Sequence, residues 1–170
     1  MPLIVETGSI VANADSYISE ADAQAYLSAR GIAAAVVVES FLLQASDFIE
    51  SHDFKGLPTN AESQSMAWPR SGVYYRSGKA VAATEVPSAI AYAQAWIANY
   101  IANGAADPNT VAERDVKREK VDVLEVEYSD QTTPGKKVIS LYDMPAAMKL
   151  LEPFLSMGAD NTKSGILHHA

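Results

Sequence analysis

The sequence predicts a mainly α-helical fold: a compact bundle of about four helices with a β-hairpin-like extended arm at approximately residues 105–143. Three observations predict this class. Apolar residues recur at steps of three and four, the period of a half-buried helix. The chain has 170 residues, the usual size of one domain. From residue 105 it becomes polar and charged, with one strand-like alternation. We expect a single domain over 1–170, with its helical core at 17–104 and 144–155 and a loose tail at 156–170.

The first half of the core should hold two long segments. Residues 1–18 read as a strand or an extended arm, and Ser19 is a candidate N-cap for a helix that ends before Gly31. A second helix is expected over about 33–52, because its apolar residues form one stripe. That stripe consists of Val38, Phe41, Leu42, Ala45, Phe48 and Ile49.

Proline and glycine set the remaining helix limits. A turn at 54–60 and a short helix over about 61–67 should precede Trp68-Pro69, since a residue before proline avoids the helical region. After a loop at 70–86, a helix is expected over about 87–103. A last helix should open near Pro145 and carry Met148, Leu151 and the apolar pair Phe154-Leu155 inward.

The arm shows one clear strand pattern, at 121–128. Leu124, Val126 and Tyr128 alternate with Glu125 and Glu127, as in a strand with one apolar face. A turn near residue 134 suggests 137–142 as its return strand. Because a two-stranded ribbon alone is marginally stable, it should lean on its own helices or on another subunit.

Composition excludes several function classes. The formal net charge of −8 and the pI of about 4.8 disfavour binding to a phosphate backbone, although a local basic patch stays possible. The absence of cysteine removes disulfides, thiolate metal sites and cysteine nucleophiles. We expect no secretory leader in the first residues. The uncharged stretch 86–106 fits a packed amphipathic helix better than a membrane span.

Catalytic patterns are weak. The sequence from Gly72 to Gly78-Lys79 has five residues between its glycines, and alanine follows the lysine, so it is not a phosphate loop. The histidines, His52 and the pair His168-His169, lack metal-ligand spacing. We therefore expect no enzyme activity, no cofactor and no metal site.

Two segments are candidate contact sites. Trp68-Pro69 is best explained as a structural anchor of a loop on the helices; alternatively, Arg70, Tyr74 and Tyr75 form an exposed aromatic and basic patch for protein or single-stranded nucleic acid. The basic run at 114–120, with Lys117, Arg118 and Lys120, precedes the predicted strand. It is either a solvated face or a docking surface for an acidic neighbour, such as a second copy.

Several motifs together resemble a known family. They are Val5-Glu6-Thr7-Gly8 with Asn13-Ala14-Asp15-Ser16-Tyr17, the segment Gln64-Ser65-Met66-Ala67-Trp68-Pro69-Arg70-Ser71-Gly72, Val86-Pro87, and Val116-Lys117-Arg118-Glu119-Lys120-Val121 followed by Leu124-Glu125-Val126-Glu127-Tyr128. The chain resembles small tailed-bacteriophage proteins that are often labelled DnaT-like single-stranded-DNA-binding proteins and are similar to head–tail adaptor (head-completion, connector) proteins. The resemblance covers nearly the whole chain and is weakest at 72–85 and in the tail.

The resemblance implies a structural virion protein. Such an adaptor forms a ring, commonly of twelve copies, between the portal protein at the DNA-packaged vertex and a stopper or tail-terminator protein. Packaged DNA passes through its channel without specific binding, and no membrane is involved. Its location would be the head–tail interface of the virion, and the host cytoplasm during assembly. The alternative is the single-stranded-DNA-binding function of the label.

Overall fold

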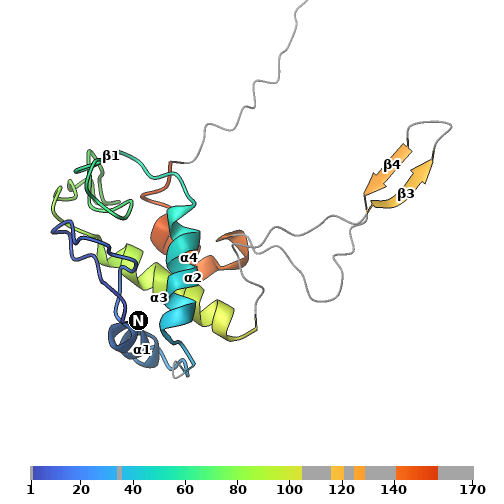
Figure 1. Ribbon diagram of the computed structural model, residues 1–170, viewed down its shortest axis with the longest axis horizontal. Coiled ribbons are helices and arrows are strands. Elements are labelled where there is room, and N and C mark those ends of the chain that lie inside the picture. Colours follow the sequence, from blue (N-terminus) through green and yellow to red (C-terminus); the bar gives the residue numbers. More distant parts are fainter. Residues whose placement is uncertain (1, 34–35, 105–115, 121–124, 129–140, 157–170) are drawn as a thin grey trace, which may run out of the picture.

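The computed structural model describes residues 2–33, 36–104, 116–120, 125–128 and 141–156. Helices are the main regular elements of these residues, as the sequence predicts. Two antiparallel strand pairs accompany them (Figure 1). The elements, in chain order, are α1 (Glu20–Ser28), α2 (Glu39–Glu50), β1 (Leu57–Pro58), β2 (Arg70–Ser71), α3 (Ser88–Ala102), β3 (Val116–Lys120), β4 (Glu125–Tyr128), the 3-10 helix η1 (Leu141–Asp143) and α4 (Pro145–Leu151).

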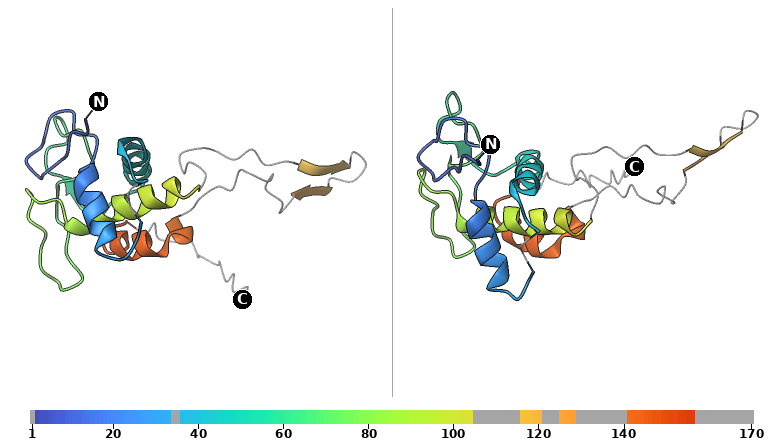
Figure 2. Two further views of the ribbon diagram at one scale, coloured as in Figure 1. Left: turned by 90° about the horizontal axis from the view of Figure 1, so that it is seen from below. Right: turned by 60° about the horizontal axis from the view of Figure 1, so that its bottom comes forward.

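Helix α3 is the centre of the helical body, because α1, α2 and α4 all pack against it. Figure 1 shows α2 crossing α3, and the two views of Figure 2 show α4 beside α3. The alanine-rich sequence of α3 allows this close approach of neighbours on several sides. Ile90, Ala93, Ile97 and Ile101, which recur at steps of three and four, are its buried stripe.

The predicted limits of α1 and α3 are confirmed within about two residues. The Ser19 hydroxyl accepts the amide hydrogen of Asp22 at 3.1 Å, so it caps α1. Gly31 has φ of 74°, the left-handed conformation expected after this helix. α4 begins at Pro145, as predicted, and ends at Leu151, before Pro153.

The expected start of the second helix at residue 33 is wrong, since α2 begins at Glu39. Val38 is extended, with φ of −115° and ψ of 169°. Val37 is fully buried, and its carbonyl accepts a hydrogen bond from the Gln24 side chain at 2.9 Å. β-Branched residues lose rotamer freedom in a helix, and here an extended backbone also gains a tertiary partner.

The short helix expected at 61–67 is also wrong, because turns occupy these residues. The side chain of Gln64 satisfies the local backbone instead: it accepts from the amide of Asn60 and donates to the carbonyls of Met66 and Pro69. The amide of Ala67 donates to the carboxylate of Glu50 on α2 at 2.7 Å. Side-chain partners, Gln64 from the segment itself and Glu50 from α2, thus replace the helical ladder.

The N-terminal segment closes a loop around a buried carboxylate. Val5 bridges to Ser16 in parallel, and Glu6 is buried. Its two oxygens accept the amides of Gly8, Ile10 and Val11 at 2.7–3.1 Å. The Glu6 carboxylate accepts hydrogen bonds from three backbone N–H groups and so stabilises a turn that otherwise has few internal hydrogen bonds.

The arm contains a ribbon, but its strand pairing differs from the prediction. β4 pairs with β3, which is formed by the basic run, and residues 141–143 form η1 in place of the end of a return strand. The remainder of the predicted return strand, Leu124, and the tail from 157 lie outside the described residues. In both views of Figure 2 the ribbon lies apart from helices α1–α4.

Candidate functional site

Trp68 lies at the centre of an aromatic cluster. Its side chain is fully buried, and its ring packs edge-on against Phe54 at 5.8 Å and Phe154 at 5.5 Å between centroids. The peptide bond between Trp68 and Pro69 is cis, and Pro69 is buried as well. The indole Nε1 has no hydrogen-bond partner within the described part of the chain. Ring packing is therefore what holds Trp68, and the side chain is not available to a ligand.

The alternative in which Arg70 belongs to an exposed patch is wrong, because its guanidinium is directed into the body. It donates to four backbone carbonyls, at 2.8–3.2 Å, those of Phe54, Lys55, Gly56 and Ala67. Desolvation by burial lowers the pKa of Arg70, while the nearby Glu50 opposes that shift. Arg70 thus ties two loops together and cannot bind a phosphate or a partner.

A buried polar network joins the N-terminal segment to α2 and α3. The Tyr17 hydroxyl donates to Glu50 and accepts the amide hydrogen of Trp68 at 3.2 Å. Burial, and then the charge of Glu50, raises the pKa of Tyr17 well above its usual value. Gln94 accepts the Tyr17 amide at 2.8 Å and donates to the Ser16 hydroxyl and the Leu42 carbonyl. Gln94 cannot be recognised from the sequence, since a single polar residue in a helix gives no burial signal.

Tyr74 and Tyr75 belong to a hairpin that we define as residues 73–81. Val73 and Val81 close its base with a 2.9 Å backbone hydrogen bond, and Tyr74 bridges to Ala80. Tyr75 points inward, with its ring against Phe154 and its hydroxyl donating to Glu85 at 2.5 Å. Burial, and then Glu85, raises the pKa of Tyr75 to about 12. Tyr74 is 60% exposed, so only one of the two tyrosines can meet a partner.

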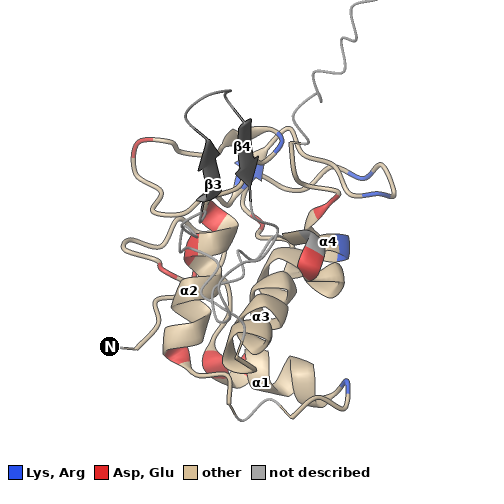
Figure 3. Cartoon of the chain, turned by 90° about the vertical axis from the view of Figure 1, so that its right-hand side faces the viewer, with Lys and Arg blue, Asp and Glu red and all other residues tan. Residues whose placement is uncertain are grey.

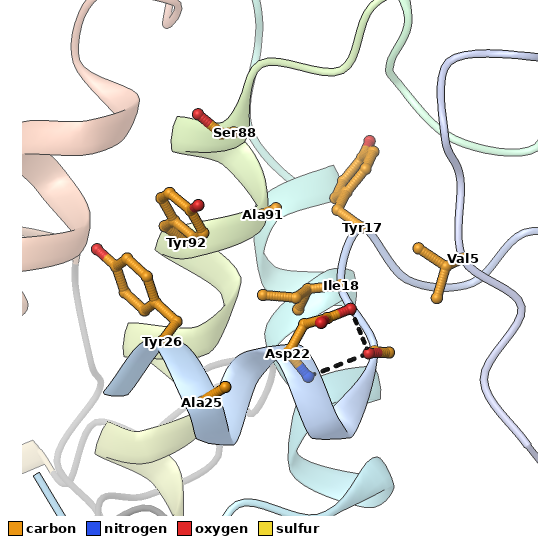
Figure 4. Close-up of a pocket in the computed structure, with 10 residues that line it drawn as sticks. Val5, Tyr17, Ile18, Asp22, Ala25, Tyr26, Ser88, Ala91 and Tyr92 are labelled. Atoms are coloured by element: carbon orange, nitrogen blue, oxygen red, sulfur yellow. Dashed lines mark hydrogen bonds between the residues drawn. The ribbon is translucent and has the colours of Figure 1, made fainter. Parts of the chain in front are cut away.

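An open pocket of about 440 Å³ lies where α1 meets α3. Figure 4 shows Tyr26 and Tyr92 on one side of it, Tyr17 and Val5 on the other, and Ile18 and the alanines between them. Its polar groups are Ser19 and Asp22, which hydrogen bond to each other at 2.6 Å, and Ser88. The lining combines apolar walls with one carboxylate, and nothing in it resembles a catalytic set.

A stack of three side chains flanks this pocket. The rings of Tyr26 and Tyr92 are parallel, 3.9 Å apart, and the Arg30 guanidinium lies 3.5 Å from the centroid of Tyr26. Such cation–π stacks are worth about 0.5–1 kcal/mol at exposed sites. Tyr26 of α1 and Arg30, two residues beyond the end of this helix, are four residues apart in the sequence, a spacing that signals their contact; Tyr92 cannot be placed without the fold.

The basic run is distributed over β3 opposite acidic positions of β4. The register sets Arg118 opposite Glu127 and Lys120 opposite Glu125, with an irregularity between Val116 and Arg118. Val126 lies opposite Glu119, and Tyr128 opposite Val116. Facing positions of opposite charge stabilise an antiparallel pair. Over the two strands, three cations including Lys117 therefore balance three carboxylates, and the ribbon is not a basic surface overall.

Within the described ranges, no group of three or more His, Asp or Glu side chains is arranged to hold a metal ion. No helix in those ranges has both the length and the apolar character that crossing a membrane requires. His168 and His169 lie outside them.

Comparisons with known proteins give one match. No curated protein and no solved structure matches the chain. A family model described as "Putative DnaT-like ssDNA binding protein" matches residues 1–168, nearly the whole chain. The chain therefore belongs to this DnaT-like family.

Proposed function

We propose that this protein is a structural subunit of a phage virion: a ring-forming head–tail adaptor that joins the portal protein to a stopper or tail-terminator protein. The observation that carries the proposal is the β3–β4 ribbon, which lies apart from the helices (Figure 1). A ribbon of two short strands is marginally stable alone, so contact with neighbouring copies in a ring would stabilise it. The phage resemblance of the motifs supports the same function.

The charge of the body favours this function over tight DNA binding. The described helical body, residues 2–33, 36–104 and 141–156, has twelve acidic and six basic side chains. One of those six, Arg70, is used internally. An acidic ring repels the phosphate backbone, and DNA can then pass through it without adhering.

The decisive experiment is negative-stain imaging of the purified portal protein with and without this chain. We expect an added ring on the portal; a portal without added density contradicts the adaptor function. A charge reversal in β3, K117E/R118E/K120E, tests whether the ribbon is needed for the ring, because like charges would then face Glu125 and Glu127 across the two strands. This variant should fail to form the ring. K149E, a single reversal at an exposed position of α4, serves as its control.

Single-stranded-DNA binding is the second candidate, and the family description favours it over the adaptor function. Candidate aromatic and basic groups for it include Tyr74, Arg76 and Lys79 of the hairpin, together with the β3 cations. Fluorescence anisotropy with a labelled oligonucleotide at low salt tests it. Tight binding that weakens steeply with salt would place DNA binding first, as counterion release requires. The Tyr74→Ala variant should then weaken binding, because base stacking on an aromatic ring is lost.

A further inference from the structure

The hairpin 73–81 is rooted in the core but carries an exposed tip. Val73 and Val81 at its base are buried, and Tyr75 is held by Phe154 and Glu85. The tip is closed by two further backbone hydrogen bonds of 2.9 Å, from Tyr75 to Lys79 and from Gly78 to Tyr75. A protrusion that is already ordered loses little conformational entropy when it binds, which favours a role in contact.

The chemistry of the tip is unusual for this acidic chain. Tyr74, Arg76 and Lys79 are all exposed there, so an aromatic ring and two cations stand together. Tyrosine and arginine are enriched among the residues that dominate protein interfaces. Arg76 pairs with Glu152 at 2.5 Å, but both side chains are about half exposed or more, at 66% and 47%. An exposed pair is worth at most about 1 kcal/mol, so Arg76 can exchange this partner for another.

A surface of complementary character is formed by α2 and by two exposed valines that precede it. We call it the α2 stripe and define it by Val36, Val38, Glu39, Leu43 and Asp47. Glu39, Leu43 and Asp47 are four residues apart in turn and therefore share one face of the helix. The valines and Leu43 account for three of the six large apolar side chains that are exposed among the described residues. Tyr74 of the hairpin is another.

The two surfaces lie on different sides of the body, so their contact joins two copies. In Figure 3, α2 bears acidic residues on one side of the view, while a loop bearing Lys and Arg extends on the other. A contact between two different surfaces of identical subunits is head-to-tail, and it closes into a ring when the rotation permits.

We propose that the tip of hairpin 73–81 docks on the α2 stripe of a second copy of this chain. Tyr74 meets the exposed side chains of Val36, Val38 and Leu43, and the cations Arg76 and Lys79 face the carboxylates Glu39 and Asp47. The inference rests on the proposed assembly of copies and names the surfaces that would make it. The occupant is a second copy because the stripe offers both the apolar groups and the charge that the tip lacks.

A charge-exchange experiment tests this contact. One variant reverses the tip, R76E/K79E, and a second reverses the stripe, E39K/D47K. Each variant alone brings like charges together and should associate with itself roughly tenfold more weakly than the natural chain in sedimentation velocity at low salt. An equimolar mixture should recover association, because every tip then meets a stripe of opposite charge.

The controls separate this contact from general charge effects and from misfolding. E62K and K149E alter exposed charges outside both surfaces and should associate like the natural chain. Circular dichroism checks folding; if E39K/D47K is unfolded, D47K alone replaces it, since Asp47 is exposed and outside the first turn.

Each outcome decides between the proposals. Association of the natural chain that neither variant changes, or a mixture that stays monomeric, overturns the docking contact. A natural chain that is monomeric at every concentration does so as well, whereas the adaptor function is judged separately by the ring on the portal. If R76E/K79E instead abolishes oligonucleotide binding and leaves association intact, the hairpin is a DNA-binding element and the docking proposal is wrong.

Discussion

Tyr17 and Glu50 share a hydrogen bond in which the phenol donates to the carboxylate, and the same phenol oxygen accepts the amide of Trp68. Through these two bonds one side chain connects the N-terminal segment, α2 and the segment before β2. Glu50 uses its second oxygen for the amide of Ala67. The pair thus provides hydrogen-bond acceptors for the backbone amides of Ala67 and Trp68, which lie in a segment without a helix or strand of its own.

Removal of the phenol should destabilise the fold. Tyr17→Phe leaves a buried carboxylate oxygen and a buried amide without this partner, and we expect a loss of about 1–3 kcal/mol in the free energy of unfolding. Urea denaturation followed by circular dichroism measures it. Tyr74→Phe is the matched control, because its hydroxyl is on an exposed side chain; a change within about 0.5 kcal/mol is expected there. Equal effects of the two substitutions would contradict the role given to Tyr17.

Glu50 should make stability depend on pH in the direction opposite to that of a salt-bridged carboxylate. Desolvation by burial raises its pKa above 4.5, although Tyr17, Ala67 and Arg70 oppose the shift. Between 4.5 and the raised value the folded chain binds more protons than the unfolded chain. The contribution of Glu50 is therefore complete below that range and is lost as pH rises through the raised pKa.

Comparison with Glu50→Gln isolates this effect, because the other carboxylates titrate in both proteins. The free energy of unfolding of the natural chain minus that of Glu50→Gln should fall as pH rises above 4.5, and then level off. Urea denaturation at a series of pH values provides both curves. A difference that is constant or rises with pH contradicts the assignment.

Arg70 should not tolerate lysine, although the charge is kept. The guanidinium donates to four carbonyls in a fixed planar geometry, whereas an ammonium has three donors on a flexible stem. We expect Arg70→Lys to lose about 2–4 kcal/mol of stability, as for a broken buried network. Thermal unfolding measures the loss, with Lys149→Arg, at an exposed position, as a neutral control. A stable Arg70→Lys variant would show that the charge alone suffices.

Gly56 and Gly31 should respond differently to alanine, although their φ values are similar, 71° and 74°. A Cβ at Gly56 would lie 2.2 Å from the Ser71 carbonyl oxygen and 2.7 Å from Val73 Cγ2, while at Gly31 nothing lies within 4 Å. Gly31→Ala should therefore cost only the left-handed strain of about 1–2 kcal/mol. Gly56→Ala should cost clearly more, because β1 must move away from β2. Paired denaturant titrations give the comparison, and equal losses contradict the close packing.

The sequence was sufficient for the helices with strong periodicity and clear end signals. Ser19, Gly31 and Pro145 mark helix ends through local chemistry, and α3 has its apolar stripe where the spacing places it. The expected helix at 61–67 is wrong because the Gln64 side chain bonds the local backbone and the amide of Ala67 donates to Glu50, a partner that only the tertiary fold brings near.

The candidate contact residues show the same contrast between what local sequence predicts and what only the tertiary fold determines. Trp68 and Arg70 were singled out together by residue type, but type alone does not show whether a side chain points inward. Both are buried, and Tyr75 is half-buried, which leaves Tyr74 as the exposed member of that group. The strand partner of β4 was missed because a basic run has no apolar alternation, whereas its charges match those of Glu125 and Glu127 across the ladder.

The central position of α3 has a consequence for synthesis on the ribosome. Helices α1 and α2 leave the exit tunnel first, yet the helix that both of them cover is encoded after them. Their apolar faces therefore stay uncovered until α3 has emerged as far as Ala102. The face of α3 that packs against α4 stays uncovered for longer, because α4 begins more than 40 residues later. A translational pause placed between α3 and α4 would prolong that exposure and should raise the yield of aggregated nascent chains.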